Sequence, residues 1–175
     1  NLVNNMPEGA DLPDEALDEV QVGMFRLLED GRPNVRAAAV RCLLRLPQPN
    51  DDGDFDECEV VSNLLNVLSR DKSKEVRKAV ITVLPVTKYT MPFLVARTRD
   101  ESDDVRKTTF VILAEKTTID DVEQSLVATM LCKGLSDRVP SVVEAAEALV
   151  TSWFDSSGGE PLTLLKAMNA TEHVE

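Results

Sequence analysis

A short motif occurs four times along this chain of 175 residues. Each copy begins with an aspartate, and a valine follows five residues later. The four aspartates are Asp30, Asp71, Asp100 and Asp137, so successive copies are 41, 29 and 37 residues apart. Repeats of this length accommodate two helices joined by a turn. Such a unit cannot bury its apolar stripe alone, so the chain must fold as a stack of neighbouring units.

The residues around each aspartate predict where helices begin and end. Polar residues follow the aspartate, with Pro33 or Pro140 in two copies, at a position that opens a helix. From each valine onward the apolar residues keep helical spacing, which predicts second helices from Val35, Val76, Val105 and Val142. First helices are predicted at about 14–29, 55–70, 91–99 and 119–135. The third is short, which accounts for the 29-residue interval.

This pattern predicts an all-α protein, an α-solenoid of the HEAT-repeat type. It would contain about four helical hairpins and the start of a fifth, whose opening helix is predicted at 161–169. The repeats are expected at about 14–50, 55–86, 90–117, 119–154 and 161–175, in a single segment over 1–175. An aromatic content of 4% suits thin layers of closely packed helices. The chain has no initial Met, and it stops soon after the fifth helix begins. We therefore expect a segment of a larger protein.

Several classes of function find no support in the sequence. The only histidine, His173, lies in a polar tail, so no His-based acid–base relay is available and we expect no enzyme, cofactor or small-molecule substrate. The acidic run at 51–59 lacks the glutamate of a calcium loop, because its twelfth position is Ser62, so we expect no metal site. The longest apolar run, 110–114, is too short to span a membrane. Three widely spaced cysteines predict reduced thiols in the cytosol or nucleus.

The distribution of basic residues suggests a binding surface despite a net charge of −12. Residues 31–50 contain four arginines and no acid, and residues 70–107 contain ten bases against six acids. Rows of basic side chains on stacked second helices would contact the phosphates of DNA without contacting the edges of the nucleotide bases. The predicted DNA-binding residues are Arg36, Arg41, Lys72, Lys74, Arg77, Lys78, Arg106 and Lys107.

Two alternatives remain open for these residues. Arg36, Arg77 and Arg106 share one row, and such arginines also pair with the turn aspartates of neighbouring repeats in a structural ladder. Lys72 and Lys74 also fit simple solvated charges. The fourth copy has Val143 and Glu144 at the matching positions, so the basic rows end there. A scaffold that binds only protein, of the transport-receptor or phosphatase-regulatory type, would also account for the pattern.

The chain resembles a known family, condensin complex subunit 3. The resemblance rests on an ordered set of segments at residues 32–46, 74–80, 91–100, 105–107, 113–116, 134–138 and 152–154. It implies a non-catalytic subunit of a much longer protein that binds the kleisin subunit, and through it the SMC ATPase subunits. It also implies binding of double-stranded DNA without sequence specificity in mitotic chromosome condensation. The implied locations are the nucleus, the cytoplasm and condensed chromosomes.

Overall fold

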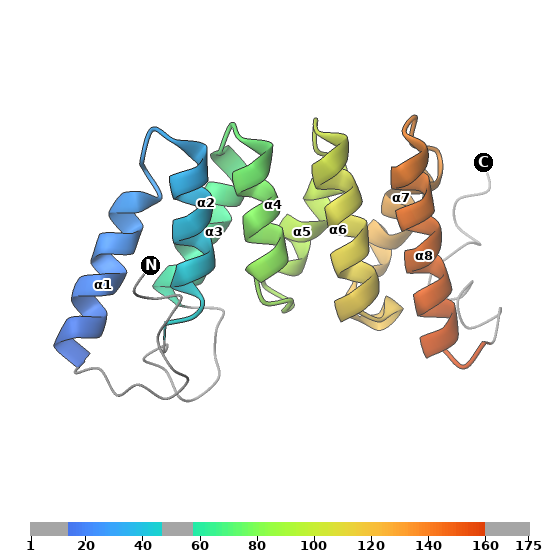
Figure 1. The fold of residues 1–175 in the computed structure, drawn as a ribbon. Helices are drawn as coiled ribbons and strands as arrows, with labels where there is room; N and C mark the ends of the chain where they lie inside the picture. The colour runs from blue at the N-terminus through green and yellow to red at the C-terminus, as the bar shows by residue number, and fades with distance from the viewer. Residues whose placement is uncertain (1–13, 47–57, 160–175) are drawn as a thin grey trace. The chain divides into compact units, whose positions relative to one another are not determined.

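The computed structural model describes residues 14–46 and 58–159, which contain helices and no strand. The chain divides into two compact units, with the boundary between Pro85 and Val86. Unit 1 contains α1 (Asp14–Leu27), α2 (Pro33–Leu43), α3 (Glu59–Arg70) and α4 (Lys74–Val83) (Figure 1). Unit 2 contains α5 (Met91–Arg97), α6 (Asp103–Lys116), the 3-10 helix η3 (Ile119–Asp121), α7 (Gln124–Leu135) and α8 (Pro140–Ser156). None of the described helices combines the length and hydropathy that a membrane span requires.

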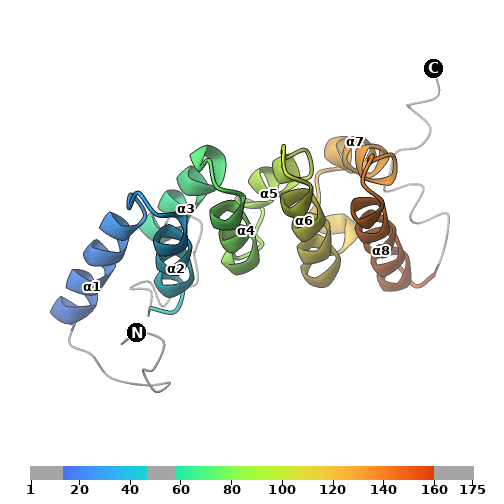
Figure 2. The same cartoon turned by 45° about the horizontal axis from the view of Figure 1, so that its top comes forward.

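Unit 1 is built from two helical hairpins, α1–α2 and α3–α4. The second helices of the hairpins, α2 and α4, pack side by side, and α3 lies in a second layer against α4 (Figures 1 and 2). We call α1, α3, α5 and α7 the A helices, and α2, α4, α6 and α8 the B helices. The apolar core of unit 1 includes Val40, Leu43, Leu64, Leu68, Val76 and Val80, all fully buried.

Unit 2 repeats this arrangement, with α6 packed against α8 and α7 packed against α8. Two close contacts fix these helices. A Cβ added to Gly134 of α7 would overlap the ring of Phe110 and would lie 2.9 Å from the Cβ of Ala146. The close approach of α7 to these residues therefore requires a position without a side chain. The fully buried Trp153 donates its indole N–H to the Thr117 carbonyl at 3.1 Å.

The repeated aspartates build the turns between A and B helices. In each turn the carboxylate accepts a hydrogen bond from the backbone N–H two residues later, a geometry that aspartate favours because its side chain is short. The four distances are 2.8 Å for Asp30 to Arg32, 2.8 Å for Asp71 to Ser73, 2.9 Å for Asp100 to Ser102 and 3.0 Å for Asp137 to Val139. The repeat motif is therefore a turn signal, and each B helix begins three residues after the aspartate of its turn.

The predicted helices agree with the structure except at two starts. The prediction of one helix from residue 119 is wrong, because Thr118 and Asp121 form a capping box around the short helix η3 and α7 begins only at Gln124. The third A helix, α5, is indeed the shortest, at seven residues. Helix α3 begins at Glu59, later than the expected residue 55. The predicted fifth helix, His173 and most of the acidic run lie outside the described residues.

Candidate nucleic-acid interface

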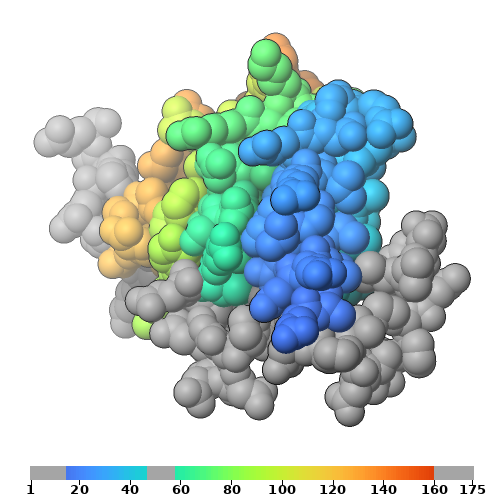
Figure 3. Space-filling model, turned by 90° about the vertical axis from the view of Figure 1, so that its left-hand side faces the viewer, coloured from blue at the N-terminus to red at the C-terminus, as the bar shows by residue number. Residues whose placement is uncertain are grey.

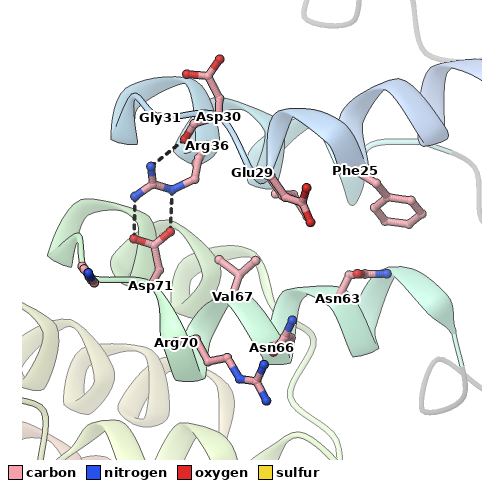
Figure 4. A pocket seen from close by; sticks show the side chains of 12 residues that line it. Phe25, Glu29, Asp30, Gly31, Arg36, Asn63, Asn66, Val67, Arg70 and Asp71 are labelled. Carbon is pink, nitrogen blue, oxygen red and sulfur yellow. Dashed lines mark hydrogen bonds and ion pairs between the residues drawn. The ribbon is translucent and has the colours of Figure 1, made fainter.

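Arg36 of α2 links two turns of unit 1. Its Nε and one Nη donate to the two carboxylate oxygens of Asp71 at 2.7 and 2.8 Å, and its other Nη donates to the Asp30 carbonyl at 2.8 Å (Figure 4). The side chains of Arg36 and Asp71 are only 15% and 7% exposed. This paired, fork-like geometry is the strongest form of an Arg–carboxylate contact.

Arg106 of α6 makes the same set of contacts in unit 2. Its guanidinium donates to the two carboxylate oxygens of Asp137 at 2.7 and 2.9 Å and to the Asp100 carbonyl at 2.9 Å. The two side chains are 9% and 11% exposed. The two copies of the motif thus produce one geometry, in which an arginine joins its own turn to the turn of the next hairpin.

These contacts lower the pKa values of the Asp71 and Asp137 carboxyls. For Asp71, burial acts to raise the pKa, but the hydrogen bonds from Arg36 and from the Ser73 N–H outweigh it, so the pKa lies below its ordinary value. For Asp137, the hydrogen bonds from the Arg106 side chain lower the pKa, against the opposing effect of burial. Both aspartates are therefore ionised partners of permanently charged arginines at neutral pH.

Three of the predicted DNA-binding arginines are engaged within the protein. Arg36 and Arg106 are paired as described, and Arg77 is 4% exposed and donates to the Asp71 carbonyl at 2.8 Å. A phosphate contact needs N–H groups that reach solvent. The geometry of these residues fits the structural ladder, the alternative that the sequence left open.

The other predicted cations of unit 1 lie on its surface. Arg41 of α2, Lys72 of the α3–α4 turn and Lys74 of α4 are exposed. The side chain of Lys78 is 31% exposed and lies 3.7 Å from the carboxylate of Glu75, one turn earlier on α4. Because α2 and α4 pack side by side, Arg41 and Lys78 belong to adjacent helices of the same layer. We call the surface of these two helices and of the turn after α2 the α2/α4 face. Its residues are Asn34, Ala38, Arg41, Arg45, Lys74, Glu75, Lys78 and Thr82.

Lys107, the remaining predicted residue, has a different electrostatic setting. It is exposed on α6 of unit 2, between Asp103 one turn before it and Glu115 two turns after it. The neighbouring helix α8 exposes Glu144 and Glu147. The B helices of unit 2 thus present more carboxylates than cations, in contrast with the α2/α4 face.

Each unit also contains a crevice beside the turns. In unit 1 it has a volume of about 420 Å³ and lies between α1 and α3, which are neighbours on the surface shown in Figure 3. In unit 2 the crevice has a volume of about 480 Å³ and is lined by three exposed cations that the sequence analysis did not select, Arg99, Lys133 and Arg138. A comparison of residues just before and after each repeat aspartate would have found Arg99 and Arg138.

The chain is similar in sequence to curated proteins along nearly all of its length. No family model matches it. Condensin complex subunit 3 of Homo sapiens is 34% identical over 175 residues, which cover 99% of this chain and 17% of the human protein. The Xenopus laevis and Schizosaccharomyces pombe proteins of the same name are 33% and 29% identical, over 99% and 93% of this chain. The chain spans 16–18% of the length of these relatives.

Solved structures give the same relationship. The crystal structure of the S. pombe condensin Cnd3–Cnd2 subcomplex matches 95% of this chain and 22% of the matched chain, with a TM-score of 0.83 and 28% identity. The TOG domain array of crescerin matches with a TM-score of 0.54 and 16% identity, which shows a shared fold alone. The predicted fold, helical hairpins of the HEAT type, is confirmed. The chain is therefore homologous to a segment of condensin complex subunit 3.

Proposed function

We propose that this chain is a non-catalytic segment of a condensin subunit, and that it binds the phosphate backbone of double-stranded DNA through the α2/α4 face. The single observation that supports the DNA proposal is that the basic residues of unit 1 fall into two groups. The ladder engages Arg36 and Arg77, whereas Arg41, Lys72, Lys74 and Lys78 lie at the surface.

The geometry of this face suits a backbone contact. Helices α2 and α4 both run away from the turns, so Arg41 and Lys78 are about one helical turn, roughly 5–6 Å, apart along the helix axes. Packed helices lie about 8–10 Å apart, so the two cations reach neighbouring phosphates of one strand or facing phosphates across a groove. The Lys78–Glu75 pair is exposed and weak, so a phosphate can replace the carboxylate at little cost. Without base-edge contacts, binding would be independent of sequence.

The test is the salt dependence of duplex binding. Affinity of the intact subunit for a labelled 30-base-pair duplex is measured over a range of salt concentrations, for the wild type and for Arg41→Glu/Lys78→Glu. Each lost phosphate contact should reduce the slope of log affinity against log salt by about 0.9, so the double variant should bind more weakly and lose a slope of nearly 2. Lys107→Glu, tested alone, decides whether α6 of unit 2 also contacts DNA.

A charge-matched control separates a local contact from a general electrostatic effect. Arg26→Glu/Arg70→Glu makes the same change in charge on two exposed residues in the last turns of the A helices α1 and α3. The proposal expects this control to retain most of the wild-type affinity. An equal loss in both variants, or an unchanged titration for Arg41→Glu/Lys78→Glu, would reject the α2/α4 face as the DNA surface.

We further propose that the chain contributes to binding of the condensin kleisin subunit, and through it to assembly with the SMC ATPase subunits on chromosomes in the nucleus and cytoplasm. The support is the match to a structure in which Cnd3 is complexed with Cnd2. Hydrogen exchange of the intact subunit, with and without its kleisin, should show protection within residues 14–46 or 58–159. Exchange that is unchanged in both ranges would place the kleisin contact elsewhere in the protein.

A scaffold that binds only protein is the second candidate function. The observation that favours it is the acidic character of the unit 2 B helices, where Asp103, Glu115, Glu144 and Glu147 are exposed around Lys107. A duplex would be repelled there, whereas a basic protein segment would be attracted. If the intact subunit binds the duplex and none of the tested substitutions of basic residues in this chain weakens that binding, this second function is favoured.

A further inference from the structure

The crevices of the two units occupy equivalent positions in the repeat. When Asp30 is aligned with Asp100, and Asp71 with Asp137, all nine residues that line the unit 2 crevice correspond to residues that line the unit 1 crevice. In both units the ladder arginine, Arg36 or Arg106, forms part of the wall. The chain thus contains two versions of one cavity, built on the same backbone framework.

The two versions differ in charge. Glu29 and Val67 of the unit 1 crevice correspond to Arg99 and Lys133 of the unit 2 crevice, whereas Gly31 corresponds to the acidic Glu101. Lys72 and its counterpart Arg138 are both cations. Unit 1 has one further cation, Arg70, where unit 2 has Ser136. Three exposed cations therefore converge on the unit 2 crevice, in a chain whose net charge is −12.

Three carboxylates line this crevice: the exposed Glu101, and Asp100 and Asp137, which are both engaged by hydrogen bonds. Asp137 is bound on both oxygens by Arg106. Asp100 accepts hydrogen bonds from the Ser102 N–H at 2.9 Å and from Arg97 at 3.4 Å. By contrast, within the described part of the chain Arg99, Lys133 and Arg138 form no ion pair. The lining contains four cations and three carboxylates, and its three exposed cations provide the donors that a doubly charged anion needs.

We propose that the unit 2 crevice binds a phosphorylated serine or threonine side chain of a protein partner. A phosphoryl group carries nearly two negative charges and three acceptor oxygens, and clusters of Arg and Lys recognise it in many proteins. Arg99 and Arg138 would donate in pairs to its oxygens, and Lys133 would supply a point charge from the last turn of α7.

The surroundings favour a single phosphoryl group over a nucleic acid. The exposed Asp103 begins α6 just after the crevice, and α8 exposes Glu144 one turn after it begins. A duplex presents a phosphate every few ångströms, so it would place further negative charge against these carboxylates. A peptide with one phosphoryl group satisfies the cations without that repulsion.

The test uses the intact subunit and a fluorescein-labelled peptide with one phosphoserine among glycines and alanines. We expect binding of this peptide and at least tenfold weaker binding of its unphosphorylated form, because charged hydrogen bonds to phosphate contribute about a factor of ten or more. The variant Arg99→Glu/Lys133→Val gives the unit 2 crevice the unit 1 residues at these two positions, and it should lose about tenfold or more in affinity for the phosphopeptide. Arg138→Ala, on an exposed turn, provides a second variant and should lose several-fold.

A matched control lies in the other crevice. Arg70→Glu/Lys72→Val makes the same change of charge in unit 1 and should leave phosphopeptide affinity unchanged. Equal binding of the two peptides, an equal loss in the control, or unchanged binding in Arg99→Glu/Lys133→Val and Arg138→Ala would each overturn the proposal. A 30-base-pair duplex is the competing ligand. Duplex affinity that falls in the unit 2 variants, without phosphopeptide binding, would assign the crevice to DNA instead.

Discussion

The guanidinium of Arg36 joins Asp71, which lies 35 residues later in the chain, to the carbonyl of Asp30, six residues earlier. Arg106 joins Asp137 to Asp100 in the same way. One side chain therefore closes its own turn and fixes the turn of the next hairpin. Because the arginine must reach both turns at once, the ladder sets the register of neighbouring hairpins as well as adding to their stability.

The first prediction concerns this ladder. Arg36→Ala should destabilise unit 1 by roughly 2–4 kcal/mol, because it leaves the nearly buried carboxylate of Asp71 without its charged partner. Hydrogen exchange of α2 and α4 amides in the intact protein measures the loss as faster exchange. Arg32→Ala is the control, since Arg32 is 74% exposed in its pair with Asp30 and its removal should not change exchange measurably. Equal rates for Arg36→Ala and wild type would show that the ladder contributes nothing.

The second prediction is a dependence of stability on pH. The pKa values of Asp71 and Asp137 are lowered in the folded state from an ordinary value of 3.8. Their stabilising effect is therefore complete above that ordinary value and is lost as pH falls through the lower, folded pKa. Asp71→Asn/Asp137→Asn should be less stable than wild type at pH 7, and its stability should fall less steeply below about pH 4. Denaturant unfolding at several pH values checks both statements, and parallel curves would contradict them.

Much of the fold was predictable because the repeat is a local signal. The aspartate in the turn after each A helix acts within two residues, through its own side chain, and proline opens two of the B helices. These interactions do not depend on distant contacts. The break before α7 was not predictable in the same way. Its apolar residues Ile119 and Val122 are both buried and imitate a helical pattern, while the Thr118–Asp121 capping box forms a separate short turn.

The role of each basic residue was less predictable than its position. Arg77 and Lys78 are adjacent in the sequence, yet one is 4% exposed and the other has a side chain that is 31% exposed. Sequence spacing placed Arg36, Arg77 and Arg106 in one row but could not decide between a partner in the next hairpin and a phosphate. Of the crevice cations, Arg99 and Arg138 lie beside repeat aspartates and could be found from the repeat, whereas Lys133 joins them only in the folded chain.

The third prediction tests the close approach of helices in unit 2. Gly134→Ala should destabilise this unit by about 1–3 kcal/mol, because the added methyl group meets the buried ring of Phe110 and the Cβ of Ala146. Gly23→Ala is the control, since Gly23 lies within α1 and a Cβ there has no atom within 4 Å. The control should stabilise α1 by about 0.5–1 kcal/mol through helix propensity. Similar effects of the two changes on α7 exchange would contradict a packing role for Gly134.

The last prediction concerns Trp153, the only tryptophan of the chain. Its indole N–H donates to both the carbonyl and the hydroxyl oxygen of Thr117 at 3.1 Å, which ties α8 to the end of α6. Trp153→Phe keeps an apolar ring but removes the donor and leaves a cavity, so α6 and α8 should lose about 2–4 kcal/mol. Thr117→Val separates the two causes, because it removes the hydroxyl acceptor and retains the carbonyl and the indole. Hydrogen exchange at the end of α6 should rise strongly in Trp153→Phe and weakly in Thr117→Val. A larger effect in Thr117→Val would show that the hydroxyl, which also donates to the Leu113 carbonyl at 2.6 Å, matters more than the indole.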